Sequence, residues 1–193
     1  MSNKSIEIND SSTQLSMNPK KFAMWLFIVS VVMVFAALTS AYIVRQAEGN
    51  WYVFDLPSVF YTSSAVILLS SLTMHWGVLS AKKDNFKSLS IAMAITGVLG
   101  VVFLVLQVIG WSDLVDISVH FVGNPSGSFL YVITGLHGVH VISAVIFLLV
   151  VMVNALRQKI HAKKMSQLEI CATYWHFLDG LWIYLFIFLL INR

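Results

Sequence analysis

Five apolar stretches, each about as long as a membrane-spanning helix, dominate this 193-residue sequence. A helix needs about 20 residues to cross the roughly 30 Å hydrocarbon core of a bilayer. Hydrophobic residues make up 58% of the chain and charged residues 11%, whereas about a quarter of the residues are charged in soluble domains. The sequence therefore predicts an all-α integral membrane protein, built as a bundle of five transmembrane helices. The expected spans are residues 22–44, 57–80, 89–111, 129–156 and 170–191.

The polar N-terminal segment is predicted to lie on the cytoplasmic side. Residues 1–20 form this segment, and residues 21–193 form the five-helix transmembrane domain. The first span is too long for the apolar core of a signal peptide, which has about 7–15 residues. We therefore expect it to remain in the mature protein. Residues 112–128, which contain Gly, Asn and Pro, are predicted to form a turn-rich connection outside the membrane.

The basic residues indicate the orientation, because Lys and Arg are retained on the cytoplasmic side of membranes. Most of them precede the first span or lie in the second and fourth connections: Lys4, Lys20, Lys21, Lys82, Lys83, Lys87, Arg157, Lys159, Lys163 and Lys164. Arg45 and Arg193 fall on the opposite side. With an odd number of crossings, the N-terminus is predicted to be cytoplasmic and the C-terminus outside. The net charge of +3 then reflects topology and contact with anionic lipid, and no nucleic-acid partner is expected.

Two pairs of polar residues lie inside the last two predicted spans. His137 and His140 are three residues apart, as are His176 and Asp179, and residues at this spacing share a helix face. Ionisable groups inside a membrane are energetically expensive and commonly functional. We expect these four residues, with Glu169, to form a structural polar cluster that joins neighbouring helices through hydrogen bonds.

A metal site formed by the same four residues is the more specific alternative, because His and Asp side chains are ligands for zinc and iron. The sequence has no second Glu-x-x-His element of the kind that di-metal bundles use, so no metal is assigned. A haem held between His140 and His176 is less favoured still, since their bulky neighbours leave no run of small residues to open a cavity. Hydroxyl residues in the second span are expected to pack closely and to hydrogen-bond to their own helix. They include Ser63, Ser64, Ser70, Ser71 and Thr73.

Two sequence blocks carry a family resemblance. Residues 134–141 read Thr-Gly-Leu-His-Gly-Val-His-Val, and residues 174–182 read Tyr-Trp-His-Phe-Leu-Asp-Gly-Leu-Trp. At this spacing, and with Glu169 ahead of the second block, they resemble subunit III of the haem-copper terminal oxidases (cytochrome c oxidase subunit III) in a five-helix form. Weaker matches follow in family order along the earlier spans, so that the resemblance covers nearly everything after Lys20. They lie at residues 24–27, 41–42, 56–57, 68–73 and 100–107.

The resemblance implies a core subunit with no redox centre and no catalytic residue of its own. It implies docking beside catalytic subunit I and subunit II, with haem and copper in those partners, in a bacterial-type cytoplasmic (inner) membrane. Membership of a respiratory supercomplex is compatible with it. The resemblance also implies that the subunit holds phospholipid in a cleft and supports proton uptake. Longer family members have seven helices, so we expect another subunit or lipid to complete here the cleft that their first two helices complete.

Phospholipid is expected against a set of interfacial aromatic and basic residues, which could meet lipid headgroups at about 1 kcal/mol per basic residue. The set is Trp25, Trp76, Lys82, Lys83 and Lys87. One departure from the family pattern bears on proton chemistry. The family usually carries a membrane-embedded glutamate after a serine of the first span, whereas Ser30 is followed here by Val31. This position therefore offers no carboxylate for proton uptake.

The predicted function is that of subunit III of a proton-pumping cytochrome c oxidase in aerobic electron transport, which is catalytic only as part of the complex. Two alternatives are kept, because other subunits bind the electron donor. They are a quinol oxidase subunit III and an accessory or assembly subunit of a nitric oxide reductase. A free-standing transporter is disfavoured. Asp179 is the only acidic residue well inside a span, and no pair of Gly/Pro-interrupted helices indicates a midplane binding site.

Overall fold

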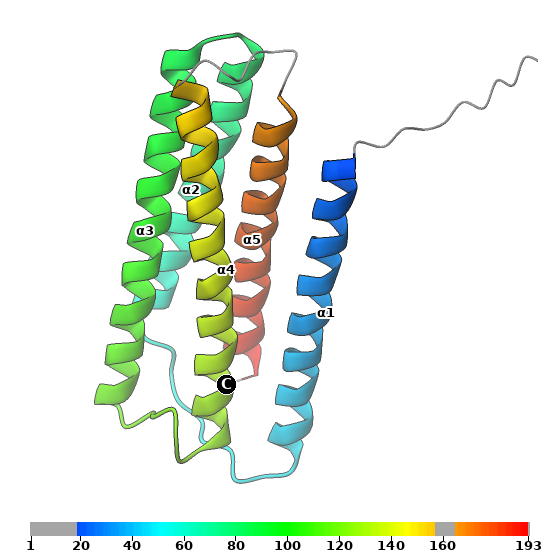
Figure 1. Cartoon of the computed structure of the whole chain (residues 1–193). Helices are drawn as coiled ribbons and strands as arrows, with labels where there is room; N and C mark the ends of the chain where they lie inside the picture. Colours follow the sequence, from blue (N-terminus) through cyan, green and yellow to red (C-terminus); the bar gives the residue numbers. More distant parts are fainter. Residues whose placement is uncertain (1–18, 157–164, 193) are drawn as a thin grey trace, which may run out of the picture.

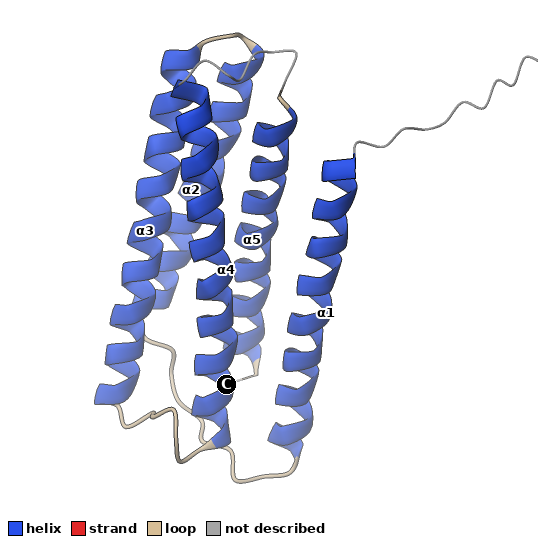
Figure 2. Ribbon diagram, in the orientation of Figure 1, coloured by secondary structure: helices blue, strands red, loops and turns tan. Residues whose placement is uncertain are grey.

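The structure is a computed structural model that describes residues 19–156 and 165–192. These residues form α1 (Pro19–Ala47), α2 (Val59–Lys82), α3 (Phe86–Asp116), α4 (Pro125–Leu156) and α5 (Ser166–Ile191). Each helix is long and apolar enough to cross a membrane, and no strand occurs within the described ranges (Figure 2). The predicted all-α class with five transmembrane-type helices is confirmed.

Four of the helices form a closed ring, and the remaining one stands on its flank. α2 packs against α3 and α5, α3 packs against α4, and α4 packs against α5. α1 contacts α4 and α5 and lies to one side of this ring (Figure 1). Successive helices run in opposite directions, as expected when short connections join neighbouring helices of a bundle.

The predicted connection over residues 112–128 is too long at both ends. α3 continues to Asp116 and α4 begins at Pro125, which leaves residues 117–124 as the connection. Asn124 explains the early start of α4, because its side-chain oxygen accepts the backbone N–H of Ser126 at 2.9 Å. Such a bond caps the N-terminus of a helix. Proline is favoured at the first helical position because its missing N–H needs no partner there.

Small residues allow the helices to approach closely. A Cβ atom placed on Gly77 of α2 would lie 3.3 Å from the Cβ of Ala92 on α3. A Cβ atom on Gly100 of α3 would lie 2.7 Å from a ring carbon of Trp175 on α5, which is too close for two carbon atoms. The Trp175 ring therefore fills space that only glycine leaves open, as is common where helices pack through small residues in membranes.

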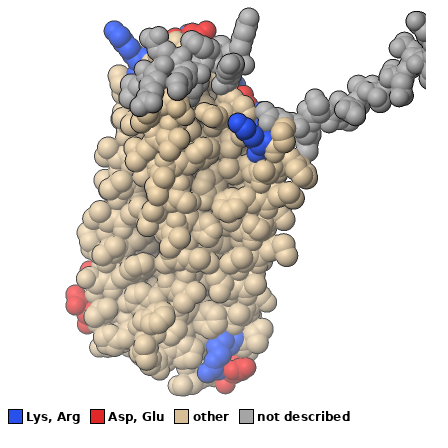
Figure 3. Space-filling view, in the orientation of Figure 1, with Lys and Arg blue, Asp and Glu red and all other residues tan. Residues whose placement is uncertain are grey.

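The exposed charged side chains of the described residues lie toward the two ends of the bundle, whereas Asp179 is buried within it. On the face shown in Figure 3, an uncharged band separates the coloured atoms near one end from those near the other. One end, which we call the lysine-bearing end, carries Lys20, Lys21, Lys82, Lys83 and Lys87. Residues 1–18 of the predicted cytoplasmic segment and the basic residues at 157–164 lie outside the described residues.

Candidate functional site

A pocket of about 410 Å³ opens between α1, α2 and α5 at the lysine-bearing end. Because α1 stands on the flank of the ring, the space beside α5 at this end is not filled by a neighbouring helix. The ionisable and aromatic residues of the pocket wall are Lys21, Trp25, His75, Lys82, Glu169 and His176. The pocket thus gathers cationic, anionic and neutral polar groups next to apolar side chains.

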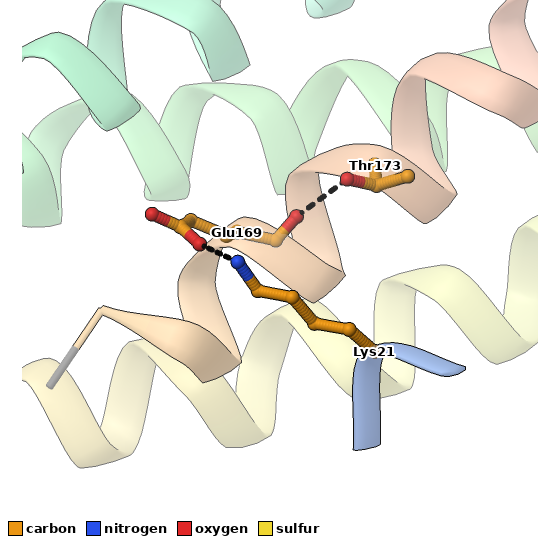
Figure 4. A network of polar contacts seen from close by, with 3 residues as sticks. All are labelled: Lys21, Glu169 and Thr173. Carbon is orange, nitrogen blue, oxygen red and sulfur yellow. Dashed lines mark hydrogen bonds and ion pairs between the residues drawn. The ribbon is translucent and has the colours of Figure 1, made fainter. Parts of the chain in front are cut away.

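An ion pair between Lys21 and Glu169 joins α1 to α5 at the pocket. The Lys21 ammonium lies 2.5 Å from a carboxylate oxygen of Glu169. Thr173, one turn further along α5, donates its hydroxyl to the Glu169 backbone oxygen at 2.8 Å (Figure 4). The two charged side chains are 47% and 40% exposed, and exposed ion pairs contribute about 0–1 kcal/mol. The pair therefore positions the end of α1 more than it stabilises the whole fold.

A second polar contact leads from the pocket into the bundle. His176 lines the pocket, and its Nδ1 atom is hydrogen-bonded to the Ser71 hydroxyl of α2 at 2.7 Å. The ring of His75 lies 6.4 Å from the ring of His176. Asp179, three residues after His176 on α5, is only 3% exposed. Asp179 Oδ2 is buried and has no hydrogen-bond partner among the residues that the structure describes.

His137 occupies a different place, inside an aromatic cage. Its ring is fully buried and lies 5.1 Å from Trp182 of α5, 5.9 Å from Phe103 of α3 and 6.4 Å from Phe35 of α1. Neither ring nitrogen has a hydrogen-bond partner within the described part of the chain. His137 of α4 is therefore surrounded by aromatic rings of three other helices and forms no hydrogen bond with the described residues.

The predicted cluster is accordingly divided among separate contacts. His140 bonds through Nδ1 to the Leu136 carbonyl of its own helix at 2.8 Å, and its ring packs 5.7 Å from Phe35. Glu169 pairs with Lys21. The hydrogen bonds found among the described residues do not join either α4 histidine to His176 or Asp179. The functional role assigned to these residues stays a prediction.

No group of three or more His, Cys, Asp or Glu residues in the described ranges is arranged to hold a metal ion. His140 packs against Phe27 and Phe35 of α1, whereas His176 bonds to Ser71 of α2. The two imidazoles thus have different neighbours, which does not support the haem alternative. The absence of a metal from this chain itself stays a prediction.

The predicted lipid-binding residues fall on more than one surface. Trp25 and Lys82 line the pocket. Trp76, although 43% exposed, is not part of the pocket wall, and neither are Lys83 and Lys87. The structure therefore brings together one tryptophan and one lysine of the predicted set.

Serine side chains of α2 have a role that the sequence did not predict. Ser64 and Ser70 donate their hydroxyl protons to backbone carbonyls of α2, each at 2.7 Å, as expected for serines in membrane helices. In addition, the Ser64 oxygen accepts the indole N–H of Trp182 at 2.9 Å, and the Ser70 oxygen accepts that of Trp175 at 3.1 Å. Ser63 similarly accepts a bond from Gln107 of α3 at 3.0 Å. One hydroxyl can do both, because it has one proton and two lone pairs.

A signal for these bonds is present in the sequence. Trp175 and Trp182 are two helical turns apart, and Ser70 and Ser64 are separated by nearly the same distance on a helix that runs the other way. A buried indole needs an acceptor, and serines were the nearest candidates. Knowledge of which helix lies beside α5 was required to pair them.

Comparison with known proteins covers almost the whole chain. A family model described as cytochrome c oxidase subunit III matches residues 6–192. Cytochrome c oxidase subunit 3 of Bacillus sp. (strain PS3) is 27% identical over 86% of this chain and 83% of its own length. Cytochrome bo(3) ubiquinol oxidase subunit 3 of Buchnera aphidicola subsp. Schizaphis graminum is 28% identical over 91% and 95%, respectively. Cytochrome c oxidase subunit 3 of Rattus norvegicus is 29% identical over 86% and 67%.

The match includes every described helix, from α1 to α5, and both blocks that carried the resemblance. The family forms a subunit of multi-subunit terminal oxidases of membranes. With five helices of transmembrane type and a family model that matches residues 6–192, the chain belongs to the cytochrome c oxidase subunit III family.

Proposed function

We propose that this chain is the third subunit of a proton-pumping oxidase that takes electrons from cytochrome c and reduces dioxygen. The observation that carries the proposal is the family match over residues 6–192. In the proposed complex the chain docks beside subunit I and subunit II, which hold the haem and copper. Its N-terminus and lysine-bearing end face the cytoplasm of a bacterial-type cell.

The contacts of the described residues support a role without redox chemistry. The buried indoles bind serines of α2, His140 bonds to its own helix, and no described group of His, Cys, Asp or Glu is arranged as a metal site. These indole–serine bonds and the His140 bond thus serve helix packing and helix stability. The chain contributes to the oxidase as a scaffold that supports proton uptake by the catalytic subunit.

Oxidation of a quinol is the second candidate, because the ubiquinol oxidase subunit of Buchnera is as similar to this chain as the cytochrome c oxidase subunits are. Co-purification distinguishes the possibilities. A tagged chain should purify from its native membranes with a complex that contains haem and copper and oxidises reduced cytochrome c. Oxidation of quinol alone would favour the second candidate. A complex with haem and non-haem iron would overturn both and indicate a nitric oxide reductase.

A bound phospholipid is the second part of the proposal. Its headgroup lies in the pocket near Trp25 and Lys82, and its acyl chain follows α5 toward Gly180. Gly180 is four residues beyond the half-buried His176 on α5, and a Cβ atom placed there would meet nothing within 4 Å. The surface of α5 at Gly180 is therefore not covered by other side chains. The pocket offers the cationic groups of Lys21 and Lys82 to a phosphate.

Lipid analysis of the purified complex tests this part. Lys82→Glu reverses the charge in the pocket wall and should lower the amount of retained anionic phospholipid, whereas Lys87→Glu, outside the pocket, should not. If the lipid supports proton delivery, delipidated enzyme starts at a normal rate and then loses activity during turnover. Equal lipid retention in both variants would contradict this placement of the lipid.

A further inference from the structure

We propose that a groove at the end of the bundle opposite the lysines binds a polypeptide segment of a neighbouring subunit, which presents a lysine or arginine beside an apolar side chain. The groove is lined by residues 52–58 of the α1–α2 connection and by Asp113 and Ile117 near the end of α3. We call it the acidic groove. That the partner is a subunit of an oxidase rests on the proposed function, whereas the surface belongs to this chain alone.

The acidic groove lies where the α1–α2 connection crosses the end of the bundle. α1 packs against α4 and α5, whereas α2 packs against α3 and α5, so the connection passes from one side of the bundle to the other (Figure 1). The groove has a volume of about 550 Å³, within the range of roughly 300–1,000 Å³ that is typical of binding pockets. It shares no residue with the pocket assigned to lipid.

Apolar side chains at the rim of the acidic groove are exposed. Val53 is 68% exposed, Tyr52 51% and Ile117 45%. Tyr52 also lines a second cavity of about 250 Å³ beside the α3–α4 connection, so the two cavities meet at its side chain. Tyrosine is enriched in protein–protein interfaces, because its ring supplies contact area and its hydroxyl a hydrogen bond. The rim is therefore suited to contact with another protein.

The backbone of the connection leaves hydrogen-bonding groups for a partner. Residues 51–57 form neither helix nor strand, and Tyr52, Val53 and Phe54 take part in no backbone–backbone hydrogen bond among the described residues. Each of them carries one N–H donor and one C=O acceptor. A polypeptide segment offers the complementary acceptor and donor at every residue, which a lipid acyl chain does not. These groups therefore favour a polypeptide over an acyl chain.

The charges at this end of the bundle favour a basic partner. The acidic residues there are Glu48, Asp55, Asp113 and Asp116, whereas Arg45 is the only Lys or Arg at this end among the described residues. Arg45 is paired with Glu48. Asp113 in the groove wall takes part in neither of the ion pairs found in the described ranges. Carboxylates repel a lipid phosphate and attract a lysine or arginine.

These features together specify the bound segment. Its basic side chain pairs with Asp113, its apolar side chain packs on Val53 and Ile117, and its backbone bonds to the connection. Arginine suits the position best, because its planar fork can bind both oxygens of a carboxylate. Stable interfaces bury about 1,200–2,000 Å² in total, so the acidic groove is one anchor within a larger contact.

Photocrosslinking in native membranes tests the proposal. A benzophenone amino acid replaces Val53, the complex is crosslinked and purified, and mass spectrometry identifies the attached peptide. We expect a single segment of another subunit of the purified complex, with a lysine or arginine close to the point of attachment. The same amino acid in place of Phe121, which is exposed and lines neither cavity, should not attach to that segment.

Charge variants distinguish specific binding from proximity. Asp113→Lys should lower the crosslinking yield from position 53 by about tenfold or more, because like charges brought together in an interface are strongly unfavourable. Asp113→Asn removes the charge at nearly constant shape and should lower the yield less, and it keeps the test valid if Asp113→Lys does not assemble. Glu48→Lys makes the same charge change at the same end but outside the groove wall. This matched control should leave the yield nearly unchanged.

Four outcomes would overturn the proposal. They are attachment to phospholipid only, no attachment at all, attachment to a segment without a basic residue, and yields in the Asp113 variants equal to that of the natural residue or to that of Glu48→Lys. Subunit identity is decided separately, by the haem and metal content of the purified complex. A complex with haem and copper that shows one of these outcomes would refute the acidic groove and leave the proposed function intact.

Discussion

Trp182 donates its indole N–H to the Ser64 hydroxyl across the α2–α5 interface at 2.9 Å, in a fully buried contact. The same indole ring packs 5.1 Å from His137 on α4. One side chain of α5 therefore joins two other helices, by a hydrogen bond on one side and by ring contact on the other.

Ser64→Ala should destabilise the fold, because the Trp182 N–H would be buried without an acceptor. An unsatisfied buried donor costs about 1–3 kcal/mol, although interhelical hydrogen bonds in membranes average about 0.6 kcal/mol. We expect a loss of about 1 kcal/mol in denaturation by detergent. The double variant Ser64→Ala/Trp182→Phe should lose less than the sum of the single variants. Ser30→Ala, which removes a bond only within α1, is the control, and additivity of the two single effects would contradict the prediction.

Gly100→Ala should destabilise the α3–α5 contact, because the added Cβ would lie 2.7 Å from the Trp175 ring. Overpacking of this kind typically costs about 1–3 kcal/mol. Gly180→Ala is the matched control, since its Cβ would meet nothing within 4 Å, and it should be neutral or slightly stabilising. Thermal denaturation of the two variants in the same detergent measures the difference. Equal stabilities would show that Trp175 does not rest on Gly100.

Lys21→Glu should weaken the attachment of α1 at the lysine-bearing end, because Glu169 would then face a like charge. The exchanged pair Lys21→Glu/Glu169→Lys restores opposite charges and should recover most of the loss, which we expect to be under about 1 kcal/mol for an exposed pair. The recovery should shrink at high salt, because exposed charges are screened. A double variant no more stable than Lys21→Glu would show that the two side chains do not interact.

His137→Leu should be neutral or stabilising, because neither imidazole nitrogen has a hydrogen-bond partner among the described residues and burying a polar group without a partner is unfavourable. His140→Leu should instead lose the bond to the Leu136 carbonyl, at a cost of about 0.5–1.5 kcal/mol. Detergent denaturation compares the two. A larger loss for His137→Leu than for His140→Leu would mean that a water or a neighbouring subunit binds the imidazole of His137.

The five helices could be predicted from the sequence because span length is a strong physical constraint. Their arrangement could not. A soluble helix shows its buried face as an apolar stripe, but a membrane helix is apolar toward lipid and toward its neighbours alike. Leu72 of α2 and Val105 of α3, for example, are exposed, whereas the equally apolar Ile67 and Phe103 of the same helices are fully buried.

The candidate site was predicted only in part, for the same reason. The sequence singles out the polar residues as the unusual groups of their spans, but helical spacing could not tell which neighbour each one contacts. His176 contacts α2, whereas His137 faces an aromatic cage. The pairing of Ser64 and Ser70 with tryptophans of α5 depends on helix adjacency, which sequence spacing within one helix does not contain.

The position of α1 on the flank has a consequence for biogenesis. α1 precedes the other four described helices in the chain and has its contacts with α4 and α5, so these contacts form only after α2 and α3 have been inserted. At the end away from the lysines, Tyr42 and Gln46 of α1 both donate hydrogen bonds to the backbone oxygen of Asn192, at 3.0 Å and 2.9 Å. The attachment of α1 is thus completed only after α5, the last helix of the bundle in chain order, is in place.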